Sequence, residues 1–187
     1  NALSLVASRP PLLRKLFVAT GQEKQGRFCI QFFKEERWRN VPVDDCLPCN
    51  ALGKPLFTTS TDPNEIWPML VEKAYAKLHG CYTSIVHGEV QYALRDMTGG
   101  TVERVSFHKE DSEQVRPEVS SDAFWASLKE WAGNGTGGAS VNQDHCVGVA
   151  WTIETEESLM EGGTLKGLQF AVMHTVVAAV EYKQFRL

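Results

Sequence analysis

The chain has 187 residues with a formal net charge of −4, and 43% of its residues are hydrophobic and 22% charged. These values are ordinary for a globular protein of one domain or two small lobes, and the negative charge argues against a nucleic-acid partner. The longest apolar run lies between Lys166 and Glu181 and is too short to cross a membrane. The five cysteines form no compact framework, which favours a reducing, cytoplasmic setting over a secreted disulfide scaffold.

The first residues already have a helical pattern, since Leu3, Val6 and Ala7 share one helical face. Pro10-Pro11 ends this helix, because a proline ring clashes with the preceding turn and offers no amide donor. Composition and alternation then predict a short helix at residues 12–17, strands at 27–33, 38–43 and 56–58, and a turn at 34–36.

The best-defined helix is expected at residues 64–79. Residues 60–65 combine capping side chains with an acidic first turn, and Ile66, Leu70 and Ala74 then share one apolar face. Gly80 is expected to end the helix in the left-handed conformation. Residues 82–94 are irregular or weakly helical in pattern, and Thr98-Gly99-Gly100 breaks the chain.

Beyond residue 100 the pattern is mainly that of strands, so the fold class predicted for the whole chain is α+β. The elements expected are strands at residues 101–107, 147–153, 168–180 and 180–187, and a helix at 122–132. The opening helix has no cap ahead of it and the last strand has no turn after it. Both ends therefore look cut, and we expect a segment of a longer protein.

The apolar run at residues 168–180 contains a single histidine, His174. Val172, Val176 and Val177 are β-branched, which favours a buried strand. An imidazole in such a strand is either a core histidine bonded to a neighbour or an acid/base group facing a cleft. The run taken alone favours the core histidine, and the second interpretation stays open.

The cysteines offer a metal site as another class of function. Cys46 and Cys49 form a CxxC pair, but a structural zinc site needs four ligands, and the only other cluster is His79, Cys81 and His87. Two ordinary loop cysteines are the favoured interpretation, with zinc or redox chemistry as the alternative.

A cysteine nucleophile is activated at a helix N-terminus beside a histidine. Cys29 is expected in a strand and Cys81 and Cys146 in turns, so none of them is a convincing partner for His174. The residues alone supply a candidate base without a nucleophile.

Three stretches resemble the protease core of the calpain family. The segment WRNVPVDDCLP at 38–48 is similar to the family's EWVxVxVDDxLP, and NEIWPMLVEKAYAKLHGCY at 64–82 is similar to NEFWxxLLEKAYAKxxGxY. Asp96-Met97-Thr98-Gly99-Gly100 resembles the family's DFTGG. The resemblance is close over residues 1–100 and looser over 101–187.

This resemblance implies a papain-like, two-lobed cysteine endopeptidase core, with a helical first lobe at 1–97 and a β-rich second lobe at 98–187. It implies calcium-dependent hydrolysis of intracellular proteins by a Cys-His-Asn mechanism, in which His174 is the general base. The family's cysteine would stand just before Asn1 and its asparagine after Leu187. We therefore expect the segment by itself to be inactive and other domains to accompany it in the parent chain.

The resemblance also assigns binding roles. Glu65 matches a calcium ligand whose partners lie outside the chain, and Gly88 matches the glycine whose backbone pairs with the peptide substrate. Met173 stands where the family has a glycine that substrate approaches, and His87 replaces the usual glycine neighbour of Gly88. Such departures also occur in inactive relatives, so a catalytically inactive calpain-like scaffold or regulatory module is the alternative.

Overall fold

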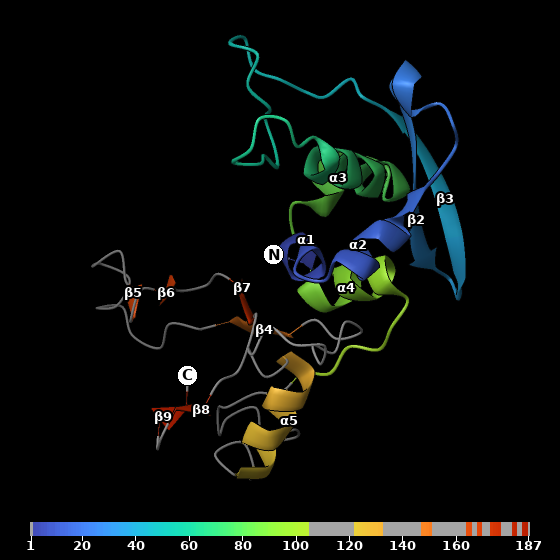
Figure 1. The fold of residues 1–187 in the computed structure, drawn as a ribbon. Coiled ribbons are helices and arrows are strands. Elements are labelled where there is room, and N and C mark those ends of the chain that lie inside the picture. The colour runs from blue at the N-terminus through green and yellow to red at the C-terminus, as the bar shows by residue number, and fades with distance from the viewer. Residues whose placement is uncertain are drawn as a thin grey trace. The chain divides into compact units, whose positions relative to one another are not determined.

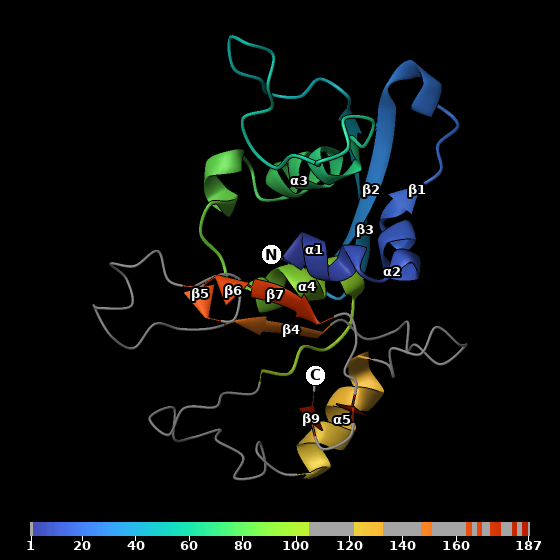
Figure 2. The ribbon, with the colours of Figure 1, turned by 60° about the vertical axis from the view of Figure 1, so that its left-hand side comes forward.

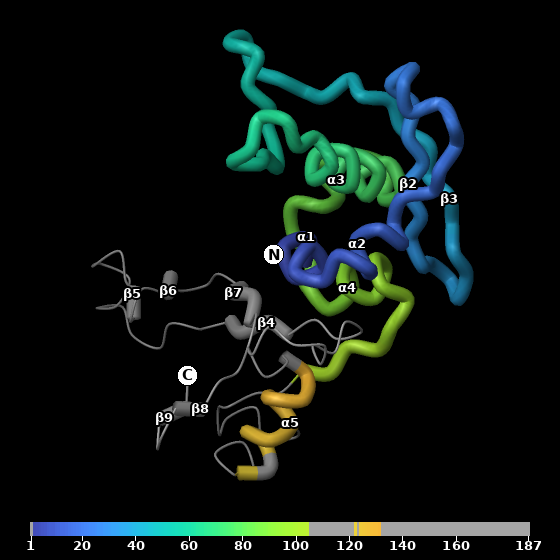
Figure 3. Tube along the Cα trace, viewed as in Figure 1, coloured from blue at the N-terminus to red at the C-terminus, as the bar shows by residue number. Residues whose placement is uncertain are grey.

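The computed structural model describes residues 2–104, 122–132, 147–150, 164–165, 168–169, 173–176, 181–182 and 185–186. Helices and antiparallel sheets make an α+β fold, as predicted. The chain divides into two compact units, and Figures 1 and 3 show the course of the chain from its blue N-terminal end. Pro11–Val102 form the continuous unit, whereas Asn1–Pro10 and Glu103–Leu187 form the discontinuous unit. The lobe boundary expected after residue 97 stays a prediction.

The continuous unit is built on an antiparallel sheet of β1 (Phe17–Val18), β2 (Arg27–Lys34) and β3 (Arg37–Asp44), in that order. Alternation places Ile30 and Phe32 of β2 in the core, because successive side chains of a strand face opposite sides. Glu35 and Glu36 both have positive φ, as a tight two-residue hairpin turn requires. The predicted pair of strands and their turn are confirmed.

Helices α2 (Pro10–Leu16), α3 (Trp67–Leu78) and α4 (Val90–Thr98) complete this unit, with the short 3₁₀ helices η1 (Glu23–Gln25) and η2 (Tyr82–Ile85). The two prolines end the first helix as expected and also begin α2, where a missing amide donor costs nothing. α3 and α4 lie on the same side of the β2–β3 sheet (Figures 1 and 2) and contact it. The fully buried large side chains of this core are Phe32, Leu16, Ile30, Leu70 and Val71.

α3 begins at Trp67, three residues later than predicted. The polar residues expected to cap it instead bond to one another: the amide of Asp62 donates to Ser60 Oγ, and that of Asn64 to Asp62 Oδ1. Such side-chain bonds stabilise turns in place of the helix. The C-terminal end agrees with the prediction, since Gly80 follows the helix with φ +104°.

Three other expectations are wrong. The single strand expected at 180–187 is instead an antiparallel pair of residues 181–182 with residues 185–186. Residues 56–58 form no strand, and the chain there has only an isolated bridge between Cys49 and Pro55. Residues 101–104, the described part of a predicted strand, are irregular. The weakly helical segment at 82–94 contains η2 and the start of α4.

The discontinuous unit contains α1 (Ala2–Ala7) and α5 (Asp122–Ala132), the latter as predicted. Strand β4 (Val147–Ala150) pairs antiparallel with β7 (Met173–Val176), and α1 contacts β7. The short pairs are β5 (Thr164–Leu165) with β6 (Leu168–Gln169) and β8 (Glu181–Tyr182) with β9 (Phe185–Arg186). Within these described residues, no helix is long and apolar enough to span a bilayer.

Candidate functional site

His174 and Met173 lie on β7 of the discontinuous unit, as the predicted strand requires. The antiparallel register sets His174 opposite Val149 and Met173 opposite Ala150 on β4. Pairing on one side fixes the backbone of this strand. The structure thus brings two of the four predicted site residues together on one element.

Glu65 lies in the continuous unit, in the loop that precedes α3. One of its carboxylate oxygens accepts a hydrogen bond from Ser60 Oγ at 2.7 Å, and its amide donates to the carbonyl of Asp62 at 3.1 Å. A carboxylate is the ligand type that calcium prefers. Among the described residues, no group of three or more acidic, histidine or cysteine side chains converges as a metal site, and the calcium role of Glu65 stays a prediction.

Gly88 lies between η2 and α4, also in the continuous unit. Its backbone is exposed, and a Cβ atom built on it would meet nothing within 4 Å. Open space beside a backbone is what an approaching peptide strand requires. Its role in binding substrate stays a prediction.

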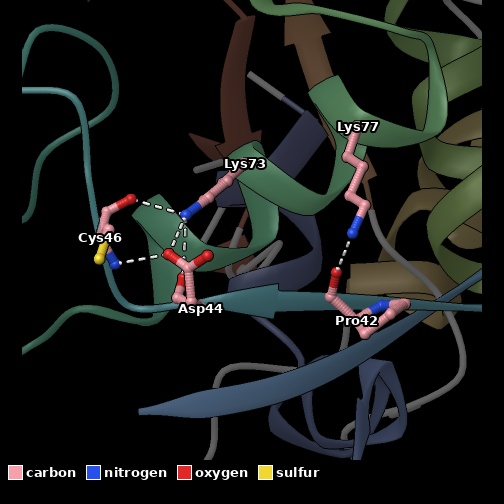
Figure 4. Close-up of polar contacts among 5 residues, drawn as sticks. All are labelled: Pro42, Asp44, Cys46, Lys73 and Lys77. Carbon is pink, nitrogen blue, oxygen red and sulfur yellow. Dashed lines mark hydrogen bonds and ion pairs between the residues drawn. The ribbon is translucent and has the colours of Figure 1, made fainter.

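The CxxC loop is fixed at its start by α3 (Figure 4). Lys73 Nζ donates to Asp44 Oδ1 and to the carbonyl of Cys46, both at 2.6 Å, and the Cys46 amide donates to Asp44 Oδ1 at 2.8 Å. The bond from Lys73 holds the pKa of Asp44 at about 2. The carboxylate of Asp44 in turn raises the pKa of the Cys46 thiol. Cys46 and Cys49 are exposed and free of disulfides.

Asp96 of α4 is the centre of a buried polar cluster that sequence patterns did not reveal. Asp96 is only 5% exposed. Its Oδ2 atom accepts hydrogen bonds from Lys34 Nζ at 2.8 Å and from the Tyr75 hydroxyl at 3.0 Å. His79 Nε2 lies 3.6 Å from the same atom, beyond ordinary hydrogen-bond range. Burial, followed by the charge of Asp96, raises the pKa of Tyr75. One carboxylate therefore joins α4 to β2 and α3.

Cys81 lies in the bend between α3 and η2, as expected for a turn residue, and directly precedes η2 without a side-chain cap bond. Its Sγ atom lies 3.1 Å from Ser84 Oγ and 2.9 Å from Thr83 Oγ1. These hydroxyls, with Ser84 contributing most, lower the pKa of the thiol to about 7. Cys29 lies on β2 as predicted, whereas Cys146 is outside the described residues.

Helices with antiparallel sheets, and a histidine on one strand, are consistent with a papain-like cysteine protease domain. A family model described as calpain family cysteine protease matches residues 1–179. The chain therefore belongs to the calpain family of cysteine proteases.

Curated relatives agree with this membership. The chain is 38% identical over 128 residues to the calpain-type cysteine protease ADL1 of Oryza sativa, covering 67% of this chain and 6% of the relative. It is 37% identical over 150 residues to Calpain-5 of Caenorhabditis elegans, which covers 79% of this chain and 21% of that relative. It is 45% identical over 98 residues to human Calpain-12, which covers 50% of this chain and 13% of that relative. The chain thus spans only a small part of each of these relatives.

Proposed function

We propose that the chain is part of a calcium-dependent cysteine endopeptidase that cleaves peptide bonds of cytoplasmic proteins. Family membership supports the reaction class. The observation that carries the finer assignment is the contact between α1 and β7. The resemblance puts the nucleophilic cysteine just ahead of α1, and β7 carries His174, so this contact suits a thiol paired with an imidazole.

In this mechanism His174 takes the proton of the thiol, and a thiolate–imidazolium pair results. The thiolate attacks the substrate carbonyl carbon, and His174 returns the proton to the leaving amine. Water then hydrolyses the acyl-enzyme. An asparagine expected beyond Leu187 would orient the imidazole.

By the family resemblance, the backbone of Gly88 would bind substrate in the continuous unit. In the discontinuous unit, Met173 is the neighbour of the proposed base His174 on β7. The thioether side chain of Met173 occupies a position where the family has glycine, and this favours the second candidate, an inactive scaffold. The two candidates differ in turnover by the parent protein. The segment by itself is expected to cleave nothing under either of them.

Calcium would act by aligning the reacting groups, since a misplacement of about 1 Å costs roughly 100-fold in rate. Glu65 would supply one carboxylate to it. A readout independent of activity is the thermal unfolding of the parent protein during a calcium titration. Glu65→Gln should weaken the calcium-induced rise in Tm, whereas Glu36→Gln, which neutralises an exposed turn residue, should leave it unchanged.

The test of catalysis uses the parent protein with calcium and a fluorogenic peptide, compared with its His174→Ala variant. We expect turnover by the first and loss of turnover by the second, with circular dichroism showing that the variant is folded. Equal turnover by both would overturn the role of His174. Absence of turnover by the unaltered protein would favour the scaffold.

A further inference from the structure

The continuous unit has a surface hollow of about 240 Å³ that no step above uses. It lies between the loop ahead of α3, the first half of α3, and η2. The residues that line it are Phe57, Thr58, Glu72, Tyr82, Ile85 and Val86. Both aromatic and aliphatic side chains thus surround a single carboxylate.

The apolar walls of the hollow include a stacked pair of rings and are partly open to solvent. The rings of Phe57 and Tyr82 are stacked, with centroids 4.1 Å apart and planes 5° from parallel. Phe57 is 43% exposed and Val86 62% exposed. Exposed apolar side chains held in a fixed geometry are typical of ligand-binding surfaces.

Glu72 supplies the polar part of the hollow. One of its oxygens accepts from the amide of Thr58 at 2.8 Å, which fixes the carboxylate in place. The pKa of Tyr82 is raised mainly by burial and secondly by the negative charge of Glu72. The charge of Glu72 therefore acts on another side chain that lines the hollow. Glu72 lines the hollow, and in the part of the chain that the structure describes its second oxygen accepts no hydrogen bond.

The nearest lysines of α3 do not neutralise this charge. Lys73 is bonded to Asp44 and Cys46, and Lys77 Nζ donates to the carbonyl of Pro42 at 2.6 Å (Figure 4). Both side chains therefore reach toward β3 and its following loop. Glu72 is the one charged side chain among the residues that line the hollow.

We propose that this hollow binds an arginine side chain of a partner peptide. The methylenes would lie along Ile85 and Val86, and the guanidinium would face the aromatic rings and bond to Glu72. An aliphatic side chain would bury the carboxylate without a partner, and an acidic one would be repelled by it. The inference goes beyond the proposed protease function, because binding here requires no catalysis.

The probe is a blocked Leu-Arg-Leu peptide, compared with the same peptide carrying norleucine in place of arginine. Titration into the ¹⁵N-labelled 187-residue chain should shift the amides of Thr58, Glu72, Tyr82 and Ile85. Glu72→Gln keeps an acceptor for the Thr58 amide and removes the charge. The lost charge-assisted bond should weaken arginine-peptide binding by about ten-fold, while the exposed control Glu89→Gln should bind as the unaltered chain does.

Equal affinity for the arginine and norleucine peptides would overturn the proposal. So would unchanged affinity in Glu72→Gln, or the absence of shifts at the hollow with the arginine peptide in large excess. All of these readouts are independent of peptide cleavage. Failure here therefore leaves the protease assignment standing, and an inactive parent protein leaves this binding test intact.

Discussion

Lys73 Nζ lies 2.6 Å from Asp44 Oδ1, and this ion pair joins the middle of α3 to the last residue of β3. The same ammonium group reaches the carbonyl of Cys46. A side chain of α3 thereby fixes the first residues of the CxxC loop.

The first prediction concerns the pH dependence of this ion pair. The folded pKa of Asp44 is about 2, below its ordinary value of 3.8, so its stabilising effect is complete above pH 3.8 and is lost as the pH falls toward 2. Lys73→Met should speed hydrogen exchange of the Cys46 amide at pH 6. Asp44→Asn should lower stability at pH 6, and its difference from the unaltered chain should shrink as the pH falls through 2. A difference that persists unchanged at pH 2 would contradict this account.

The second prediction concerns the Asp96 cluster. Asp96→Ala leaves Lys34 and Tyr75 without their acceptor, and because Lys34 is partly exposed we expect a loss of about 2–3 kcal/mol in the free energy of unfolding. Tyr75→Phe removes one bond but keeps the ring contact with Phe32, whose centroid is 5.3 Å away, and should cost about 1 kcal/mol. Urea denaturation measures both. Equal losses in the two variants would show that Asp96 acts only through Tyr75.

The third prediction compares two glycines with nearly the same backbone. Gly99 and Gly21 have φ of +71° and +72°, but a Cβ on Gly99 would lie 2.9 Å from the indole of Trp38, whereas one on Gly21 meets nothing within 4 Å. Trp38 is held by the edge of Phe33 and by Lys15 over its ring. Gly21→Ala should cost about 1 kcal/mol from strain and Gly99→Ala about 2–3 kcal/mol in all. If urea denaturation gave similar losses of stability for the two variants, the Trp38 indole would be able to move away from the added methyl group at little cost.

The fourth prediction concerns the reactivity of Cys81. With a pKa of about 7, half of the Cys81 thiol is ionised at pH 7. This fraction is roughly fifty times that of a thiol with the ordinary pKa of 9.0. The lower nucleophilicity of a less basic thiolate offsets part of this, and a roughly six-fold faster alkylation remains. Iodoacetamide labelling followed by mass spectrometry should rank Cys81 ahead of Cys46, whose pKa is raised. Ser84→Ala should slow the labelling of Cys81 at pH 7; an unchanged rate would exclude the hydroxyl as the cause.

Local patterns predicted the elements whose formation depends on local rules. Alternation identified β2 and β3, and the period of Leu70 and Ala74 identified α3. The start of α3 was misplaced because Ser60 and Asp62 can cap a helix or close a turn, and only the surrounding fold decides between these. The strand predicted at 56–58 is absent for a different reason. Two neighbouring apolar residues in a short segment do not specify another strand with which the segment would pair.

The polar clusters could not be predicted in the same way. Lys34, Tyr75 and Asp96 lie on three elements that are distant in sequence, and no spacing rule relates them. Family resemblance identified the chain and suggested His174, Met173, Glu65 and Gly88, yet the roles of these residues stay predictions. The structure shows what Asp96 of the DMTGG motif does, since its carboxylate accepts hydrogen bonds from Lys34 and Tyr75. The motif alone does not reveal these contacts.

The discontinuous unit has a consequence for synthesis on the ribosome. α1 belongs to the same unit as β7, but the whole of Pro11–Val102 is made between them. β7 follows α1 by about 165 residues, which at roughly 5–20 residues per second is a delay of roughly 8–33 s. The continuous unit is complete well before that time, so α1 emerges early and has to wait for the strand that carries His174.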